Sequence, residues 1–195
     1  MQKRRGRIQQ LIILVLLIVI VIVLIFQSNW FWRMVYPLKY GELISESSQK
    51  YGLDPALVAA MIFVESKFKP TACSHKGARG LMQIMPETGQ WIAEQLERTD
   101  YQESRLYEPE LNIEFGSWYL ASLKREFNHQ LVIVLAAYNA GRGNVARWLE
   151  EDWDGQQKSV SQLPFGETRN YVNQILKVYQ YYQKLYQPQD YLITD

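Results

Sequence analysis

The sequence predicts a mainly α-helical domain that follows a single apolar helix at the N-terminus. Residues 11–26 form an unbroken run of Leu, Ile, Val and Phe. Helix-start signals appear further along, most clearly at Asp54-Pro55, because Asp is a favoured N-cap and Pro a favoured first helical residue. No alternating run of Val, Ile and Thr indicates a substantial sheet. These three observations define the fold class.

The N-terminal segment has the pattern of a membrane anchor. Residues 1–10 are basic, with Lys3, Arg4, Arg5 and Arg7 and no acidic residue. The sixteen apolar residues that follow are fewer than the roughly 17–25 of a usual span. No charge occurs between Arg7 and Arg33, however, so a tilted helix over 11–32 is long enough. Its end at Trp30-Phe31-Trp32 resembles an interfacial aromatic belt. We therefore predict a single-pass cell-membrane protein with a cytoplasmic N-terminus and an extracytoplasmic domain.

A cleaved signal peptide is the alternative for this segment. Its apolar core would have about 7–15 residues and would end at small residues. Here the core is longer, and bulky Ile, Phe and Trp stand where a cleavage site would need small side chains. The pattern favours a retained anchor.

After the anchor, we expect a juxtamembrane linker at 33–37, one domain at 38–187 and a C-terminal tail at 188–195. Gly52 and Gly141 are typical of helix ends, and Pro109 of a helix start. Residues 131–138 suit strand or helix by composition, and the Ala pair with the following Gly141 favours helix. The predicted helices cover 38–51, 56–66, 86–97, 109–127, 131–138, 144–150 and 167–186, with a helical turn at 80–85 and loops at 71–77, 99–108 and 151–162.

Composition excludes several functions. Four of the 21 basic residues lie in the first ten positions, which leaves 17 basic against 20 acidic residues and a net charge of −3. Such a domain has no electrostatic case for binding nucleic acid. Cys73 is the single cysteine, so an internal disulfide is impossible. No Cys/His cluster has metal-ligand spacing, and we expect neither a metal nor another cofactor.

Glu65 is the residue whose position calls for a chemical interpretation. It ends an apolar helix, on the same face as Val58, Met61 and Ile62. Apolar neighbours disfavour the charged carboxylate, and the helix C-terminus adds negative partial charge, so both raise the pKa. A carboxyl group that is protonated near neutral pH suits a general acid. A surface Glu in the last turn of a helix is the alternative.

Three motifs around and after Glu65 occur in a recognisable order. The first is Glu65-Ser66-x-Phe68-x-Pro70 followed by Ser74-x-x-Gly77-Ala78-x-Gly80-Leu81-Met82-Gln83-Ile84-Met85-Pro86-x-Thr88. The others are Ala136-Ala137-Tyr138-Asn139-Ala140-Gly141-x-Gly143-x-Val145-x-x-Trp148 and Leu163-Pro164-Phe165-x-Glu167-Thr168-Arg169-x-Tyr171-Val172. Together they resemble the soluble lytic transglycosylase (SLT) family of peptidoglycan-cleaving enzymes over roughly residues 38–186. The resemblance implies a lysozyme-like, largely α-helical fold with a sugar-binding cleft.

The resemblance also implies roles for individual residues. Glu65 matches the family's catalytic acid and base. The positions that match substrate-binding residues are Ser74, Met82, Gln83, Tyr138, Asn139, Glu167 and Tyr171. Met82 as a core residue remains an open alternative, because Met commonly fills cores. The indole side chains of Trp91, Trp118, Trp148 and Trp153 are interpreted as core or rim.

The number of carboxylates distinguishes the possible reactions. Glycoside hydrolases generally use two, and Glu87, Glu94 and Glu167 are candidates for a second one. The family resemblance implies a reaction that needs only Glu65, in which the C6 hydroxyl of N-acetylmuramic acid attacks C1 and closes a 1,6-anhydro ring, and the muramyl N-acetyl group is available to assist. A hydrolytic muramidase and a catalytically silent wall-binding scaffold are the alternatives. The expected partners are peptidoglycan strands and the membrane, and a cell-wall remodelling or secretion complex stays open.

Overall fold

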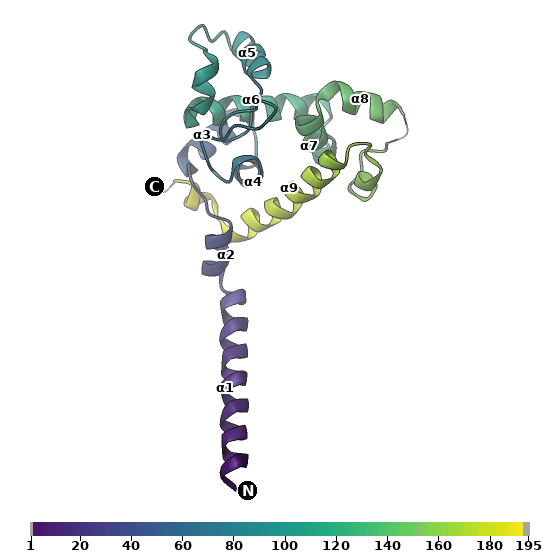
Figure 1. Cartoon of the computed structure of the whole chain (residues 1–195). Coiled ribbons are helices and arrows are strands. Elements are labelled where there is room, and N and C mark those ends of the chain that lie inside the picture. Colours follow the sequence, from purple (N-terminus) through teal and green to yellow (C-terminus); the bar gives the residue numbers. More distant parts are fainter. Residues whose placement is uncertain (1, 152, 193–195) are drawn as a thin grey trace. The chain divides into compact units, whose positions relative to one another are not determined.

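A computed structural model describes residues 2–151 and 153–192 of the 195-residue chain (Figure 1). The chain divides into two compact units, residues 1–37 and 38–195. The first unit contains α1 (Gln2–Gln27) and α2 (Asn29–Val35). Ser28 separates the two helices and caps α2, because its Oγ accepts a hydrogen bond from the backbone N–H of Trp30 at 3.2 Å.

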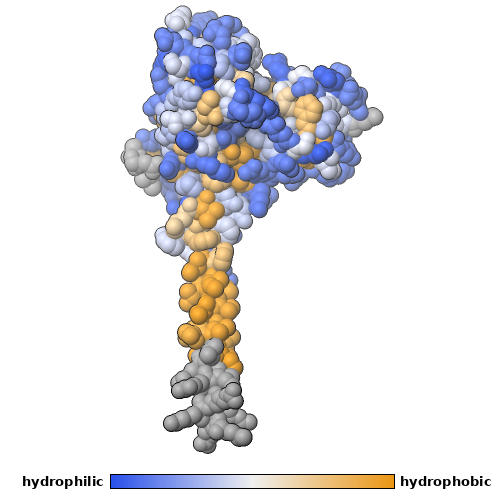
Figure 2. Space-filling model, in the orientation of Figure 1, coloured by the Kyte–Doolittle hydropathy of each residue, from blue (hydrophilic) through white to orange (hydrophobic). Residues whose placement is uncertain are grey.

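The side chains of residues 12–26 in α1 are all exposed, with between 41% and 60% of their surface accessible. Figure 2 shows this apolar helix, whose visible face is hydrophobic along its described length. Among the described residues, no single helix is both long and apolar enough to cross a membrane. Ile12–Gln27 and Asn29–Val35 meet the requirement only as a pair, and the pair is bent by 65°. The prediction of one transmembrane helix over 11–32 is therefore not confirmed in that form.

The second unit is built from seven α-helices and three short 3-10 helices in its described part. The α-helices are α3 (Gly41–Tyr51), α4 (Pro55–Ser66), α5 (Pro86–Gln95), α6 (Pro109–Glu126), α7 (Leu131–Ala140), α8 (Arg142–Glu150) and α9 (Gly166–Leu185). The 3-10 helices are η1 (Glu103–Tyr107), η2 (Gln157–Gln162) and η3 (Pro188–Leu192). No strand occurs in residues 38–151 or 153–192, which confirms the mainly α prediction. Only two isolated antiparallel bridges are present there, Cys73–Arg79 and Arg79–Ile84.

Helix α4 is the buried centre of this unit. Residues 56–62 are all buried, and α4 packs against α9. The start signal read from Asp54-Pro55 is confirmed, since Asp54 Oδ1 accepts from the backbone N–H of Ala56 at 2.9 Å. The other carboxylate oxygen of Asp54 accepts from Tyr179 Oη of α9 at 2.5 Å. One side chain thus starts α4 and ties it to α9.

Two predicted segments differ from the structure. Residues 80–85 form non-helical turns rather than a helical turn, because Gly80 (φ 78°) and Gln83 (φ 48°) have left-handed backbone. The predicted loops at 99–108 and 151–162 contain η1 and η2. Such short helices have no apolar periodicity from which to predict them.

Two further segments add to what the sequence indicated. Residues 131–140 are helical, as the Ala pair and Gly141 favoured. After residue 187, η3 packs against α3, and Tyr191 is 2% exposed. The end of the described chain therefore contributes to the core of the second unit.

We predict that Asp54→Ala destabilises the folded chain by about 1–2 kcal/mol, because the N-cap of α4 and the bond from Tyr179 are both lost. Urea unfolding of the full chain in detergent measures this difference. Asp54→Asn is the matched control, because Asn caps helices about as well as Asp and keeps an acceptor for Tyr179. Equal losses in the two variants would contradict the capping role.

Candidate active site

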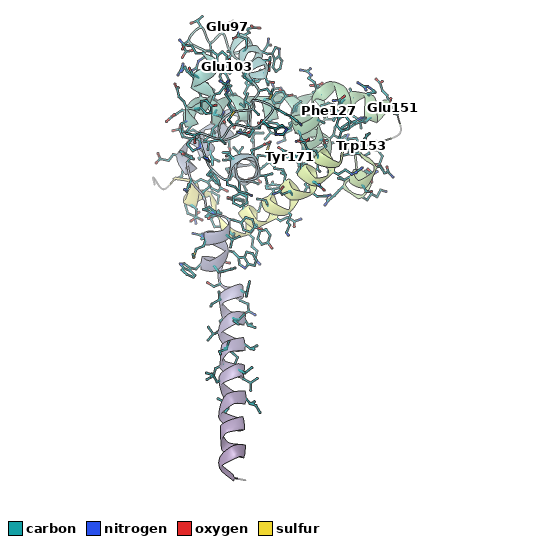
Figure 3. All side chains as sticks on the ribbon, viewed as in Figure 1. Glu97, Glu103, Phe127, Glu151, Trp153 and Tyr171 are labelled. Carbon is teal, nitrogen blue, oxygen red and sulfur yellow. The ribbon has the colours of Figure 1, made fainter. Side chains whose placement is uncertain are left out.

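The carboxyl group of Glu65 lies at the end of α4, one residue before the helix ends at Ser66. Its side chain is half-buried. Tyr171, which is labelled in Figure 3, is 7% exposed and lies in the first turns of α9. It donates a hydrogen bond from Oη to Glu65 Oε1 at 2.7 Å. The phenol therefore fixes one carboxyl oxygen and leaves Oε2 as the position for a transferable proton.

Burial controls the protonation of this group. It raises the pKa of Glu65 from 4.5 to about 7, and the hydrogen bond from Tyr171 opposes that rise. Burial, followed by the nearby Glu65 carboxyl, also raises the pKa of the Tyr138 and Tyr171 phenols well above their usual value. Both phenols consequently stay protonated and act as donors. The raised pKa of Glu65 agrees in direction with the expectation from its position in the sequence.

The loop that follows Glu65 is held by one buried amide, that of Asn112 on α6. Asn112 Oδ1 accepts from the backbone N–H of Met82 at 2.7 Å. Its Nδ2 donates to Arg79 O at 2.9 Å and to Leu106 O at 2.7 Å. Sequence reasoning missed Asn112, which lies about thirty residues from the loop and carries no motif of its own. A polar residue in the apolar part of a helix was the available signal.

Gly80 is required where this amide meets the loop. Its φ of +78° is left-handed, and a Cβ there would collide with Leu106 O and with the Asn112 amide. Ser66 adds a second support, because its Oγ donates to Leu81 O at 2.8 Å. The loop is thus fixed to the end of α4 as well as to α6.

The structure places the three predicted residues of this loop differently. Ser74 Oγ accepts from the backbone N–H of Ala78 at 3.0 Å, and Gln83 Nε2 donates to Gly80 O at 2.9 Å, so both side chains brace the loop. The side chain of Met82 is completely buried and packs against Gly116 of α6. Met82 therefore belongs to the core, one of the two interpretations that the sequence left open, and it offers a ligand no exposed surface here.

Tyr138 and Asn139 are brought together with Gln83 in one cavity of about 220 Å³. Tyr138 Oη donates to Met82 O at 3.0 Å, and Asn139 Oδ1 accepts from Thr168 Oγ at 2.8 Å. The rest of the lining is Ile84, Met85, Thr88, Tyr119, Ala140 and Gly141. An aromatic ring beside two amide side chains is a suitable environment for a sugar.

Tyr119 of α6 is a lining residue that the sequence did not reveal. Its ring lies 5.4 Å from the ring of Tyr138, between centroids. Its place in the apolar pattern of α6 is that of a core residue, and only the packing of α6 against α7 brings it to the cavity.

Glu167 is not among the residues that line this cavity. Its side chain is 68% exposed, and its Oε2 accepts from Lys76 Nζ at 3.0 Å. Glu87 and Glu94 line a different cavity. Within the described residues, no second carboxylate contributes to the raised pKa of Glu65. The same part of the chain contains no group of three His, Cys, Asp or Glu side chains that could hold a metal ion.

Comparison with known proteins identifies one family. Residues 42–160 match the family described as Transglycosylase SLT domain. The chain belongs to this family, which confirms the resemblance drawn from its motifs.

Individual relatives agree with that assignment. The soluble lytic murein transglycosylase of Salmonella typhimurium is 34% identical over 164 residues, which are 82% of this chain and 25% of that protein. The membrane-bound lytic murein transglycosylase C of Pectobacterium atrosepticum is 30% identical over 168 residues, 75% of this chain and 47% of that protein. An inactive Glu-to-Gln mutant of lytic transglycosylase Slt from Pseudomonas aeruginosa superimposes with a TM-score of 0.73 at 31% identity, covering 80% of this chain and 26% of that one. The chain thus spans only about a quarter to a half of these relatives.

We predict that stability falls as pH rises from about 4.5 to 7, because the unfolded chain then releases the Glu65 proton while the folded chain keeps it. Glu65→Gln removes this penalty. Unfolding measured at pH 4 and pH 8 should show the variant gaining on the wild type by about 2–3 kcal/mol over that interval. A constant difference between the two proteins would contradict a raised pKa. Glu110→Gln controls for the loss of a surface carboxyl.

Proposed function

We propose that this protein is a membrane-anchored lytic transglycosylase that cleaves the β-1,4 bond between N-acetylmuramic acid and N-acetylglucosamine in peptidoglycan. The observation that carries the proposal is the half-buried carboxyl group of Glu65, which has a pKa of about 7 and accepts a hydrogen bond from the phenol of Tyr171. The names of the relatives support the substrate and the reaction class.

In the proposed mechanism, Glu65 acts twice. Its protonated carboxyl group donates the proton to the glycosidic oxygen as the bond to C1 breaks. The resulting carboxylate accepts the proton of the C6 hydroxyl of N-acetylmuramic acid, whose oxygen attacks C1 and closes the 1,6-anhydro ring. No water is consumed, and Glu65 ends in its original protonation state. A pKa near 7 suits both steps, because neither protonation state is strongly disfavoured at neutral pH.

Other side chains are proposed to position Glu65 or to bind the sugars. Tyr171 holds Oε1 and orients the carboxyl group, so we assign it as a positioning residue. Tyr138, Asn139 and Gln83 would bind the sugars through the cavity that they share. Ser74 and Glu167 remain proposed substrate contacts, and we assign buried Met82 a supporting role, because its backbone binds Tyr138 and Asn112.

A hydrolytic muramidase is the competing reaction on the same site. It would add water in place of the C6 hydroxyl, and its usual form needs a second carboxylate. Glu167 is the best placed candidate by sequence, but its side chain is exposed and paired with Lys76. This arrangement favours the anhydro reaction over hydrolysis, and the intact Glu65 site disfavours a silent scaffold.

The membrane part of the proposal rests on residues 1–35. We propose that Ile12–Gln27 and Asn29–Val35 hold the chain at the cell membrane as a bent pair, with the basic residues 1–10 in the cytoplasm. Membrane-bound lytic murein transglycosylase C proteins among the relatives support membrane association. The cleaving activity would then act on the wall next to the membrane.

We expect Glu65→Gln in the full chain, assayed in detergent on purified peptidoglycan, to lower the release of muropeptides by at least about 100-fold, because the amide can neither donate nor accept the proton. Mass spectrometry of the wild-type products should show 1,6-anhydromuramyl ends. Reducing muramic acid ends would instead establish hydrolysis, and unchanged release from Glu65→Gln would refute the role of Glu65. Glu110→Gln is the matched surface control, while a comparable loss in Glu167→Gln would indicate two working carboxylates.

We expect the chain to stay in the membrane fraction after alkaline carbonate washing, because the apolar surface of residues 12–35 is removed from water only in lipid. A chain that starts at residue 33 should be released from membranes. If both forms pellet equally, the anchor lies elsewhere.

A further inference from the structure

Helix α2 follows the apolar helix α1 across a bend of 65°, which Figure 1 shows as a break between the two ribbons. A straight helix through this point would have a hydrogen bond from the N–H of Trp30 to the carbonyl oxygen of Phe26. Side chains replace both halves of that bond. The N–H of Trp30 donates to Ser28 Oγ at 3.2 Å, and the carbonyl oxygen of Phe26 accepts from Trp32 Nε1 at 2.8 Å. The sequence therefore specifies the bend.

Ring contacts hold the same bend. The ring of Phe31 lies edge-on to Phe26 at 5.1 Å and edge-on to Trp32 at 5.4 Å, between centroids. The ring of Trp32 stacks on that of Tyr36, the C-cap of α2, at 6.2 Å. This aromatic cluster runs from the last turn of α1 to the end of α2, so packing fixes the angle between the helices as well as hydrogen bonding.

Helix α2 is amphipathic. At 100° per residue, four apolar residues share an arc of about 140° on one side: Trp30, Phe31, Met34 and Val35. Asn29 and Arg33, which are one turn apart and exposed, occupy the other side. The apolar side is open to solvent, because Trp30 is 67% exposed and Met34 is 64% exposed. Such a side is stabilised when an apolar phase covers it.

Helix α1 can cross a bilayer without α2. Residues 12–27 rise only about 24 Å at 1.5 Å per residue, which is short of a span. Residues 8–11 before them are also helical and uncharged, and they extend the rise to about 30 Å. That length equals the thickness of the hydrocarbon core, and glutamines lie near both of its ends. A crossing therefore does not require α2.

The break between the helices suits the edge of the bilayer. The end of α1 and the start of α2 both have backbone groups that no intrahelical bond satisfies. Water can bind such groups at the membrane surface, whereas hydrocarbon cannot. Tryptophan side chains also favour this level of the membrane. The break, its polar Ser28 and the two indoles of α2 thus share one preferred depth.

We propose that α2 lies in the plane of the extracytoplasmic membrane interface, with its apolar side against the acyl chains and with Asn29 and Arg33 toward water. This inference rests on the membrane anchoring in the proposed function, and it separates the roles of the two helices. Helix α1 crosses the bilayer, and α2 binds its surface. Because α1 already holds α2 at the membrane, a high effective concentration lets so short a helix bind.

Depth measurements on the full chain in vesicles of phosphatidylethanolamine and phosphatidylglycerol test this arrangement. A nitroxide is attached to Trp30→Cys, Arg33→Cys or Met34→Cys, each in a Cys73→Ser background, and its collisions with oxygen and with a water-soluble nickel complex give its depth. Labels at 30 and 34 should share one depth, about 5–10 Å into the boundary between headgroups and acyl chains. The label at 33 should lie in water. Val19→Cys and Val23→Cys on α1 are the matched pair, and their labels should differ in depth by up to about 6 Å.

Two results overturn the proposal. If labels at 30 and 34 differ in depth as much as those at 19 and 23, α2 crosses the bilayer together with α1. If both labels on α2 lie in water while those on α1 lie in hydrocarbon, α2 does not bind the membrane, although the proposed anchor stands. Labels on α1 that also lie in water would instead refute the anchor itself.

A second measurement leaves the bend intact. A label on Val35→Cys should move into water when Trp30→Gln and Met34→Gln are combined, because the exposed apolar side is then lost. Asn29→Gln, on the opposite side of α2, is the control and should leave this label at its original depth. A label that keeps its depth in the Trp30→Gln/Met34→Gln variant would contradict binding through the apolar side.

Discussion

The burial of one ionisable carboxyl group at the end of an apolar helix is the constraint on which this domain depends. Glu65 lies half-buried at the end of α4, just after the buried residues 56–62 of that helix. Tyr171 reaches its carboxyl group because α9 packs against α4. The charge of Glu65 is unfavourable there, so the group keeps its proton to higher pH than an ordinary Glu. The arrangement costs stability above about pH 4.5 and supplies a proton donor at neutral pH. Asp54 at the opposite end of α4 ties the same two helices together.

Much of the fold followed from local signals in the sequence. Asp54-Pro55, Pro109 and Gly141 mark helix ends because their side chains or backbone freedom act within one turn, and the structure has helices at each. The turns at 80–85 escaped prediction because a contact distant in sequence decides them. Asn112 of α6 accepts from the N–H of Met82 and donates to the carbonyl of Arg79, and Gly80 and Gln83 have left-handed backbone that a helix does not allow. The 3-10 helices are too short for any periodic signal.

In the candidate site, too, features that depend on local sequence could be predicted, and contacts between distant residues could not. The position of Glu65 at the end of an apolar row indicated the direction of its pKa shift, and the motifs, not the position alone, selected it as the catalytic candidate. The motifs selected Gln83, Tyr138 and Asn139, which share a cavity. Tyr119 was missed because its place in the apolar pattern of α6 is that of a core residue. The pairing of Glu167 with Lys76 joins residues 91 positions apart, and no spacing rule reaches so far.

The amide of Asn112 also has a mechanical consequence. It binds Met82 in the loop that carries Gln83, and it binds Leu106 of η1. A single planar group therefore joins two surface segments that have no covalent neighbour in common, and a shift of either one bends or breaks a buried hydrogen bond to the other. The position of the loop that carries Gln83 therefore depends on the position of η1, although the two segments lie about twenty residues apart in the sequence.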